Sequence, residues 1–151
     1  MLTQDLKQTI ASLYTCLYMH TIFHFSPSSR FNMNTPVHNE ELKSCMRGYM
    51  LHHGAHLANC VGFQFPDEIA DIIQATQSDI ISGKKYLIPG YLSSTIKSCV
   101  KKLLTSPERD LYDFVGYVSG LVMWMPDNDS LKKDIYKIAE SYGYKRMNRM
   151  F

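Results

Sequence analysis

Two groups of metal-ligating side chains carry the most specific chemistry that the sequence offers. Each group has two histidines four residues apart and a cysteine one helical turn away: His20 and His24 with Cys16, and His52 and His56 with Cys60. Residues four positions apart share one face of a helix, so each group can present its ligands in a line. Two such helices side by side predict a His/Cys site for zinc or haem.

The expected spacing of the first two helices favours a plainer role for these histidines. In an antiparallel hairpin the two histidine pairs lie about 13 Å apart, at a rise of about 1.5 Å per residue. Histidines at the edge of a core are the alternative, and no cofactor is expected. His56 and Cys60 have no third group to orient a catalytic dyad. The chain has no H-E-x-x-H, G-x-S-x-G, P-loop or G-x-G-x-x-G motif, so the sequence predicts no enzyme.

Lysines dominate the segment 80–107, which contains five of them and no acidic residue. Residues 80–151 carry 12 Lys/Arg and 7 Asp/Glu, a net charge of +5, whereas residues 1–79 carry 4 and 7, a net charge of −3. A helix-turn-helix in this segment would set Ser, Thr and Lys against phosphate groups. The alternative is that the lysines keep exposed helix faces soluble. The candidates for nucleic-acid binding are Lys84, Lys85, Lys97, Lys101 and Lys102.

Methionine and aromatic residues favour a protein partner instead. The chain contains nine Met, ten Tyr and seven Phe, and these side chains are adaptable or amphipathic contact groups. The single Trp, Trp124, lies in the apolar run 121–125 before Pro126. The alternative to a partner contact for this run is a place in the core. The partner-binding candidates are Trp124, Met125, Met147, Met150 and Phe151.

The elements that must position these residues are helices. Apolar residues recur at a helical period in six segments, with cap signals at several ends: 2–23, 40–60, 66–82, 94–104, 107–125 and 131–142. We expect Ser93 or Ser94 to cap the fourth segment, Ser106 the fifth, and Gly143 to end the sixth. No strand-like alternation occurs. The pattern predicts an all-α, compact bundle of about six helices, with a polar loop at 25–38 and a basic tail at 145–151.

Length and composition agree with that class. The chain has 151 residues, 45% hydrophobic and 20% charged, which predicts a single domain, 1–151, with its own core. No run of 18 apolar residues and no secretory signal is seen, so we expect a cytoplasmic or intracellular setting and no membrane partner. No C-x-x-C pair is present, and we expect the cysteine thiols to be reduced.

These observations predict a non-enzymatic protein-interaction module of a regulatory, adaptor or effector-like kind. A second copy of the chain is an alternative partner. A DNA-binding regulator and a His/Cys metal-binding helical protein are the alternative functions.

Overall fold

The computed structural model describes residues 2–25, 42, 44, 46–48, 69–110, 114–122 and 125–144. Its helices are α1 (Gln4–Phe25), α3 (Ala70–Ser82), α4 (Tyr91–Leu104), α5 (Phe114–Val122) and α6 (Ser130–Ser141). Two short 3-10 helices, η3 (Lys85–Leu87) and η4 (Pro107–Asp110), lie between them. Within these residues there is no strand, which confirms the all-α prediction.

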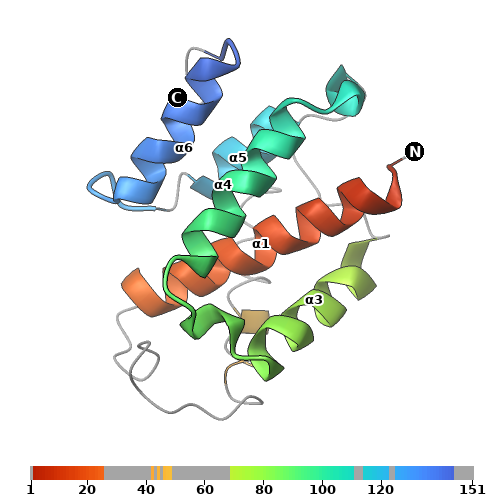
Figure 1. The fold of residues 1–151 in the computed structure, drawn as a ribbon, viewed down its shortest axis with the longest axis vertical. Coiled ribbons are helices and arrows are strands. Elements are labelled where there is room, and N and C mark those ends of the chain that lie inside the picture. The colour runs from red at the N-terminus through yellow and green to blue at the C-terminus, as the bar shows by residue number, and fades with distance from the viewer. Residues whose placement is uncertain are drawn as a thin grey trace.

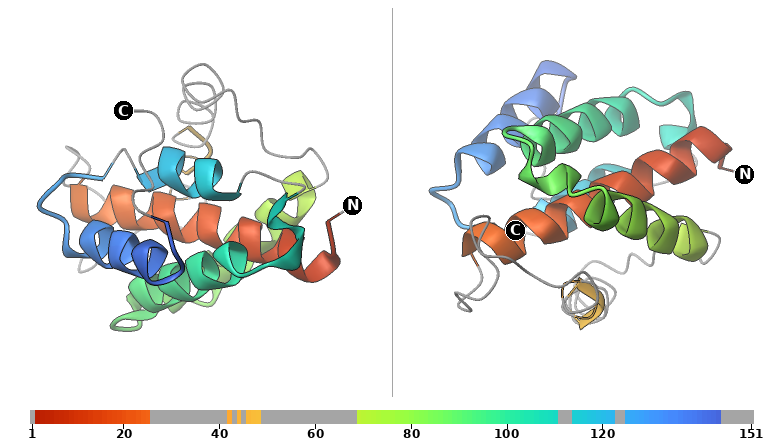
Figure 2. Two further views of the ribbon diagram at one scale, coloured as in Figure 1. Left: turned by 90° about the horizontal axis from the view of Figure 1, so that it is seen from above. Right: turned by 60° about the horizontal axis from the view of Figure 1, so that its bottom comes forward.

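The long helix α1 is the centre of the bundle. Both α3 and α4 pack directly on α1, and α6 packs beside α4 (Figures 1 and 2). The periodicity predicts one apolar face on α1, but every residue from Leu13 to His20 is buried. A helix that is covered on all sides needs apolar or hydrogen-bonded residues all round, and this explains the Tyr, Cys, Met and Thr side chains between the leucines.

The caps of the helices test the sequence predictions one by one. Gly143 has a φ of 93°, and the N–H of Tyr144 donates to the carbonyl of Ala139 at 3.1 Å, so the predicted C-terminal cap of α6 is confirmed. The predicted serine cap of α4 is wrong. Gly90, with a φ of 78°, precedes Tyr91 as the N-cap, and the hydroxyl of Ser93 donates to the Gly90 carbonyl instead of accepting an N–H.

The structure describes the fifth predicted helix in two parts, on either side of residues 111–113. The Ser106 hydroxyl accepts the N–H of Glu108 at 3.1 Å, as a cap should, but it opens the short η4. The helix α5 is described over Phe114–Val122, and Met125, at the predicted end, is not helical.

Several predicted elements lie outside the described residues. Of the helix predicted over 40–60, residues 42, 44 and 46–48 are described; they are helical, and Leu42 and Met46 are buried. The loop 25–38 beyond Phe25 and the tail 145–151 are not described. Among the helices that the structure does describe, none combines the length and the apolar character needed to cross a bilayer.

Candidate functional site

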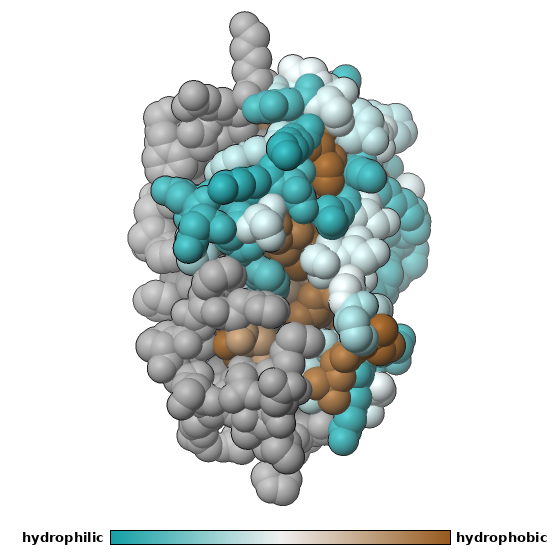
Figure 3. Space-filling model, turned by 60° about the vertical axis from the view of Figure 1, so that its left-hand side comes forward, coloured by the Kyte–Doolittle hydropathy of each residue, from teal (hydrophilic) through white to brown (hydrophobic). Residues whose placement is uncertain are grey.

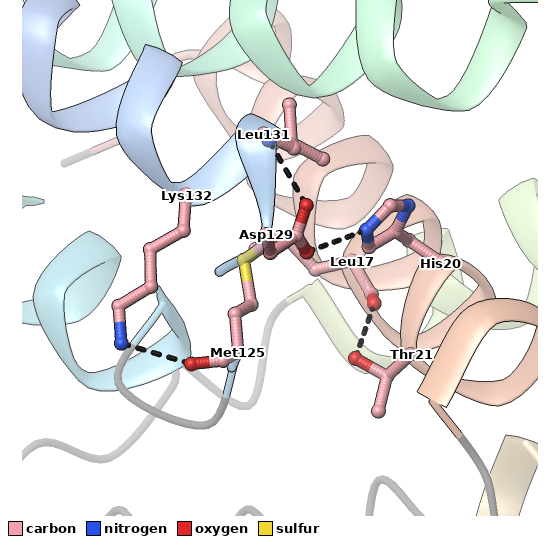
Figure 4. Close-up of polar contacts among 7 residues, drawn as sticks. All are labelled: Leu17, His20, Thr21, Met125, Asp129, Leu131 and Lys132. Atoms are coloured by element: carbon pink, nitrogen blue, oxygen red, sulfur yellow. Dashed lines mark hydrogen bonds and ion pairs between the residues drawn. The ribbon is translucent and has the colours of Figure 1, made fainter. Parts of the chain in front are cut away.

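The described histidine, His20, is part of a buried polar contact between α1 and α6 (Figure 4). Its Nε2 lies 2.9 Å from Oδ2 of Asp129, and the two side chains are 10% and 5% exposed. The other carboxylate oxygen of Asp129 accepts the N–H of Leu131 at 2.9 Å and so caps α6. Asp129 therefore joins the start of the last helix to the middle of the molecule.

Within the described residues, the first histidine group is not part of a cluster that could hold a metal ion. Cys16 is fully buried, and burial raises the pKa of its thiol to about 12, so the thiol is protonated at neutral pH. No cluster of three or more His, Cys, Asp or Glu side chains occurs within the described ranges. The side chain of His24 and the whole second group, His52, His56 and Cys60, lie outside them.

A buried lysine completes the polar contacts at this end of α6. The ammonium of Lys132 donates to the carbonyl of Met125 at 2.8 Å (Figure 4). It also donates to the carboxylate of Asp127 at 2.9 Å. Met125 itself is only 4% exposed and packs in the core, so little of its side chain is accessible to a partner in this fold. Trp124, Met147, Met150 and Phe151 lie outside the described residues.

Many of the described methionine and tyrosine side chains are likewise buried in the core. Met19 and Tyr14 are at most 1% exposed, and Tyr86 is 5% exposed. The large apolar side chains that do face solvent in the described part are Leu87, Ile88 and Tyr142, at 41%, 54% and 41% exposure. Among the coloured residues in Figure 3, hydrophilic ones predominate in the upper part, and apolar ones lie along the middle and at the lower right.

Two of these exposed side chains sit in the connection between α3 and α4, residues 83–90, which we call the α3–α4 turn. The ring of Tyr86 points inward and stacks on Phe23 of α1, with centroids 5.1 Å apart and planes 7° from parallel. Leu87 and Ile88 follow directly and face water. One buried aromatic thus anchors a turn that displays two aliphatic side chains.

The backbone of the α3–α4 turn is well defined by hydrogen bonds. The N–H groups of Leu87 and Ile88 donate to the carbonyls of Lys84 and Lys85, both at 3.1 Å. Lys84 adopts the left-handed conformation, with a φ of 52°. Outside the turn, the carboxylate of Asp79 holds the ammonium of Lys85 at 2.7 Å. A turn fixed in this way loses little conformational freedom when it binds a partner.

Sequence reasoning missed Leu87 and Ile88, although a signal was available. Tyr86 and the two aliphatic residues after it lie in a short turn bounded by glycines. Three adjacent large side chains in such a turn cannot all point into the core. Periodicity does not apply to a single 3-10 turn, so the pattern alone could not say which of the three side chains is buried.

A polar groove of about 400 Å³ runs between α1 and α4. We call it the α1–α4 groove. Its walls carry two rows of side chains four residues apart, Gln8 with Ser12 on α1 and Ser94 with Ser98 on α4. The remaining lining residues are Asp5, Thr9, Thr95, Cys99 and Lys102.

A second hollow of about 320 Å³ adjoins the first and lies between α1 and α3; we call it the α1–α3 groove. Gln8 and Ser12 line both hollows, so the two are neighbours. The amide nitrogen of Gln8 donates to Ser12 Oγ at 3.2 Å and to Thr76 Oγ1 of α3 at 2.9 Å. Asp79 and Tyr91 also line the α1–α3 groove, and in the sequence they lie on either side of the α3–α4 turn.

The predicted nucleic-acid lysines are mostly paired with carboxylates. Lys85 pairs with Asp79, and the other two ion pairs join Lys97 to Asp134 at 3.6 Å and Lys102 to Asp5 at 2.5 Å. Among the described residues only Lys84 and Lys101 of the five have no carboxylate partner. A surface for phosphates needs uncompensated positive charge, so these pairs weaken that interpretation.

The second described cysteine, Cys99, lines the α1–α4 groove but is only 8% exposed. Burial raises the pKa of its thiol to about 11, and the nearby Lys102 ammonium offsets only part of that rise. A thiol with so high a pKa is almost entirely protonated at neutral pH and is a poor nucleophile.

Comparisons of the chain with protein-family models, with curated proteins and with solved structures found no match.

Proposed function

We propose that this chain is a non-catalytic module that binds a partner protein, and that the α3–α4 turn is its main point of contact. The observation that carries the proposal is the exposure of Leu87 and Ile88 on a turn fixed by the buried Tyr86. Exposed aliphatic side chains gain free energy when a partner removes them from water, at about 25 cal/mol per Å². A rigid turn retains more of that gain, because little entropy is lost on binding.

The chemistry of the turn specifies the kind of surface that fits it. Leu87 and Ile88 call for an apolar pocket of aliphatic size on the partner. Lys84 is exposed beside them without a carboxylate partner in the described part of the chain, so an acidic side chain at the rim of that pocket is expected. The DNA-binding alternative is less favoured because three of its five lysines are already paired.

The test compares capture of a partner by matched variants of the full chain. Leu87→Ser with Ile88→Ser removes the aliphatic surface, and Tyr142→Ser is the control, because Tyr142 is as exposed as Leu87 but lies at the end of α6. Each protein is used as bait in host lysate, with nuclease added to half of the sample. We expect a nuclease-resistant partner that the wild type and the Tyr142→Ser control capture and the turn variant does not.

Two results would contradict the proposal. Equal capture by the turn variant and the control would remove the turn from the interface. Capture that disappears with nuclease would instead support the lysines and a nucleic-acid partner.

A further inference from the structure

The α3–α4 turn contains two adjacent lysines, and only one of them is paired within the described protein. The ammonium of Lys85 donates to the carboxylate of Asp79 at 2.7 Å. Its side chain passes over Gly83, where a Cβ atom would lie 3.7 Å from Cγ and 3.8 Å from Cε of Lys85. Lys84 is exposed, and no described residue forms an ion pair with its ammonium. The uncompensated positive charge of the turn is therefore that of Lys84.

Lys84 also has a backbone conformation that lysine rarely adopts. Its φ is 52° and its ψ is 33°, and no other non-glycine residue in the described ranges has a positive φ. This left-handed position follows many helices and is usually a glycine. The sequence has a glycine one position earlier, where Gly83 has an ordinary φ of −80°. A lysine at the left-handed position costs free energy, and backbone strain of this kind is concentrated at functional sites.

The backbone places Lys84 close to the aliphatic pair Leu87 and Ile88. The N–H of Lys84 donates to the carbonyl of Ile81, and the carbonyl of Lys84 accepts the N–H of Leu87, both at 3.1 Å. Residues three apart in a hydrogen-bonded turn lie within about 7 Å of each other at their Cα atoms. A partner that covers Leu87 therefore also comes within reach of the Lys84 ammonium.

The energetics of burial then limit which partners fit. Removing an ammonium from water is unfavourable unless an opposite charge or several hydrogen bonds replace the lost hydration. A surface that covers Leu87 and Ile88 without supplying such a group would lose part of the free energy gained from burying them. Nucleic acid could neutralise the lysine, but its phosphates offer no pocket for two adjacent aliphatic side chains.

We infer that Lys84 is the specificity-determining residue of the α3–α4 turn, and that the turn binds an acidic segment of polypeptide. An Asp or Glu of that segment pairs with Lys84, and apolar residues beside it cover Leu87 and Ile88. This inference rests on the proposed function and makes the carboxylate a requirement for binding. Lys85 has a positioning role, because its charge is already paired with Asp79.

The test selects phage-displayed random peptides on the full chain. Wild type is compared with Lys84→Gln, and Lys101→Gln is the matched control, because Lys101 is exposed on α4 and also has no described carboxylate partner. We expect the wild type and the control to select peptides in which Asp or Glu adjoins apolar residues. Lys84→Gln should not enrich the acidic residue, because the charge that it pairs with is absent.

Fluorescence anisotropy then measures the most enriched wild-type peptide against each variant. We expect Lys84→Gln to weaken binding about tenfold, Lys84→Arg to retain it and Lys101→Gln to change it less than twofold. Added NaCl should weaken the binding of the wild type and should affect Lys84→Gln much less. Equal binding by Lys84→Gln and the wild type would overturn the inference.

The variant Lys84→Gly separates the charge from the backbone conformation. Glycine adopts a positive φ without strain, so we expect the melting temperature to rise by about 1 to 4 °C. Peptide binding should nevertheless fall as far as in Lys84→Gln, because the ammonium is lost in both. Binding retained by Lys84→Gly would show that the partner recognises the backbone of the turn and would overturn the role of the charge.

The variant Leu87→Ser with Ile88→Ser separates this inference from the proposed function. Peptides that this variant no longer binds, but that bind Lys84→Gln normally, would overturn the inference and leave the proposed function in place. Peptides insensitive to both variants would remove the turn from the interface and contradict both proposals. Failure to select any peptide on the wild type would overturn the inference alone, since the proposed function is tested separately in lysate. Binding of a single-stranded DNA oligonucleotide that requires Lys84, without peptide binding, would also overturn it.

Discussion

Helix α1 takes part in two polar regions that differ in how deeply their groups are buried. Towards its C-terminal end, His20 and Asp129 are buried against each other, and Asp129 also caps α6. Towards its N-terminal end, Gln8 and Ser12 face Ser94 and Ser98 across an open groove. Buried polar groups require partners within the protein, whereas exposed ones bind water and can exchange it for a ligand. The first region is therefore structural, and the second is available for binding.

The largest effect is expected from a substitution in the buried polar region, where His20 contacts Asp129. Asp129→Ala removes the contact to His20 and the cap of α6 together, and we expect the free energy of unfolding to fall by about 2 to 4 kcal/mol. Urea denaturation measures the change. The control is Glu140→Ala, because Glu140 is exposed on α6 and no described residue pairs with it. Similar losses for the two variants would show that the His20–Asp129 contact has no special structural role.

The pKa values of the two described cysteine thiols allow the buried region and the groove to be compared by their pH dependence. The pKa is raised to about 12 for the fully buried Cys16 and to about 11 for Cys99 at the groove, because burial disfavours the thiolate. A raised folded-state pKa stabilises the fold below the unfolded value, near 9, and this contribution is lost as pH rises towards 11 and 12.

Alkylation reports this difference at each site. With iodoacetamide the folded chain should react slowly at pH 8 and faster as the pH rises, and Cys99 should react before Cys16. Mass spectrometry of the modified peptides measures the order, and urea-unfolded chain is the control in which both react alike. Reaction of Cys16 first would mean that the centre of α1 is more open than the groove.

The smallest change in the free energy of unfolding is expected from substitutions at the solvent-exposed α1–α4 groove. Ser94→Ala with Ser98→Ala should change the free energy of unfolding by no more than about 0.5 kcal/mol, because the hydroxyls form no hydrogen bond with described residues. Thermal unfolding measures it beside the wild type. A loss of about 2 kcal/mol would assign these serines to the structure instead of to a ligand.

The sequence predicted the helices well because their signals are local. The period of the apolar residues located α1, α4 and α6, and the glycine at position 143 predicted the end of α6 correctly. The start of α4 was mistaken because Ser93 and Ser94 resemble caps, whereas Gly90 can adopt the positive φ that this turn requires. For Met125 the sequence left open a place in the core or a contact with a partner, because burial depends on neighbours that periodicity does not reveal; its side chain is buried.

The candidate site was less predictable because it is assembled from distant parts of the chain. His20 and Asp129 are 109 positions apart, and Gln8 and Thr76 are 68 apart. No local pattern connects such residues. The exposure of Leu87 and Ile88 also depends on Tyr86 finding Phe23 on another helix.

The most direct test of the central claim is contact at the α3–α4 turn itself. A photo-crosslinking amino acid replaces Ile88 in one protein and Tyr142 in another, and each is irradiated in host lysate after nuclease treatment. The account predicts a discrete crosslinked protein from position 88 that is absent from position 142 and is competed by unlabelled wild-type chain. Crosslinks of equal yield and pattern from both positions, or none from position 88, would contradict it.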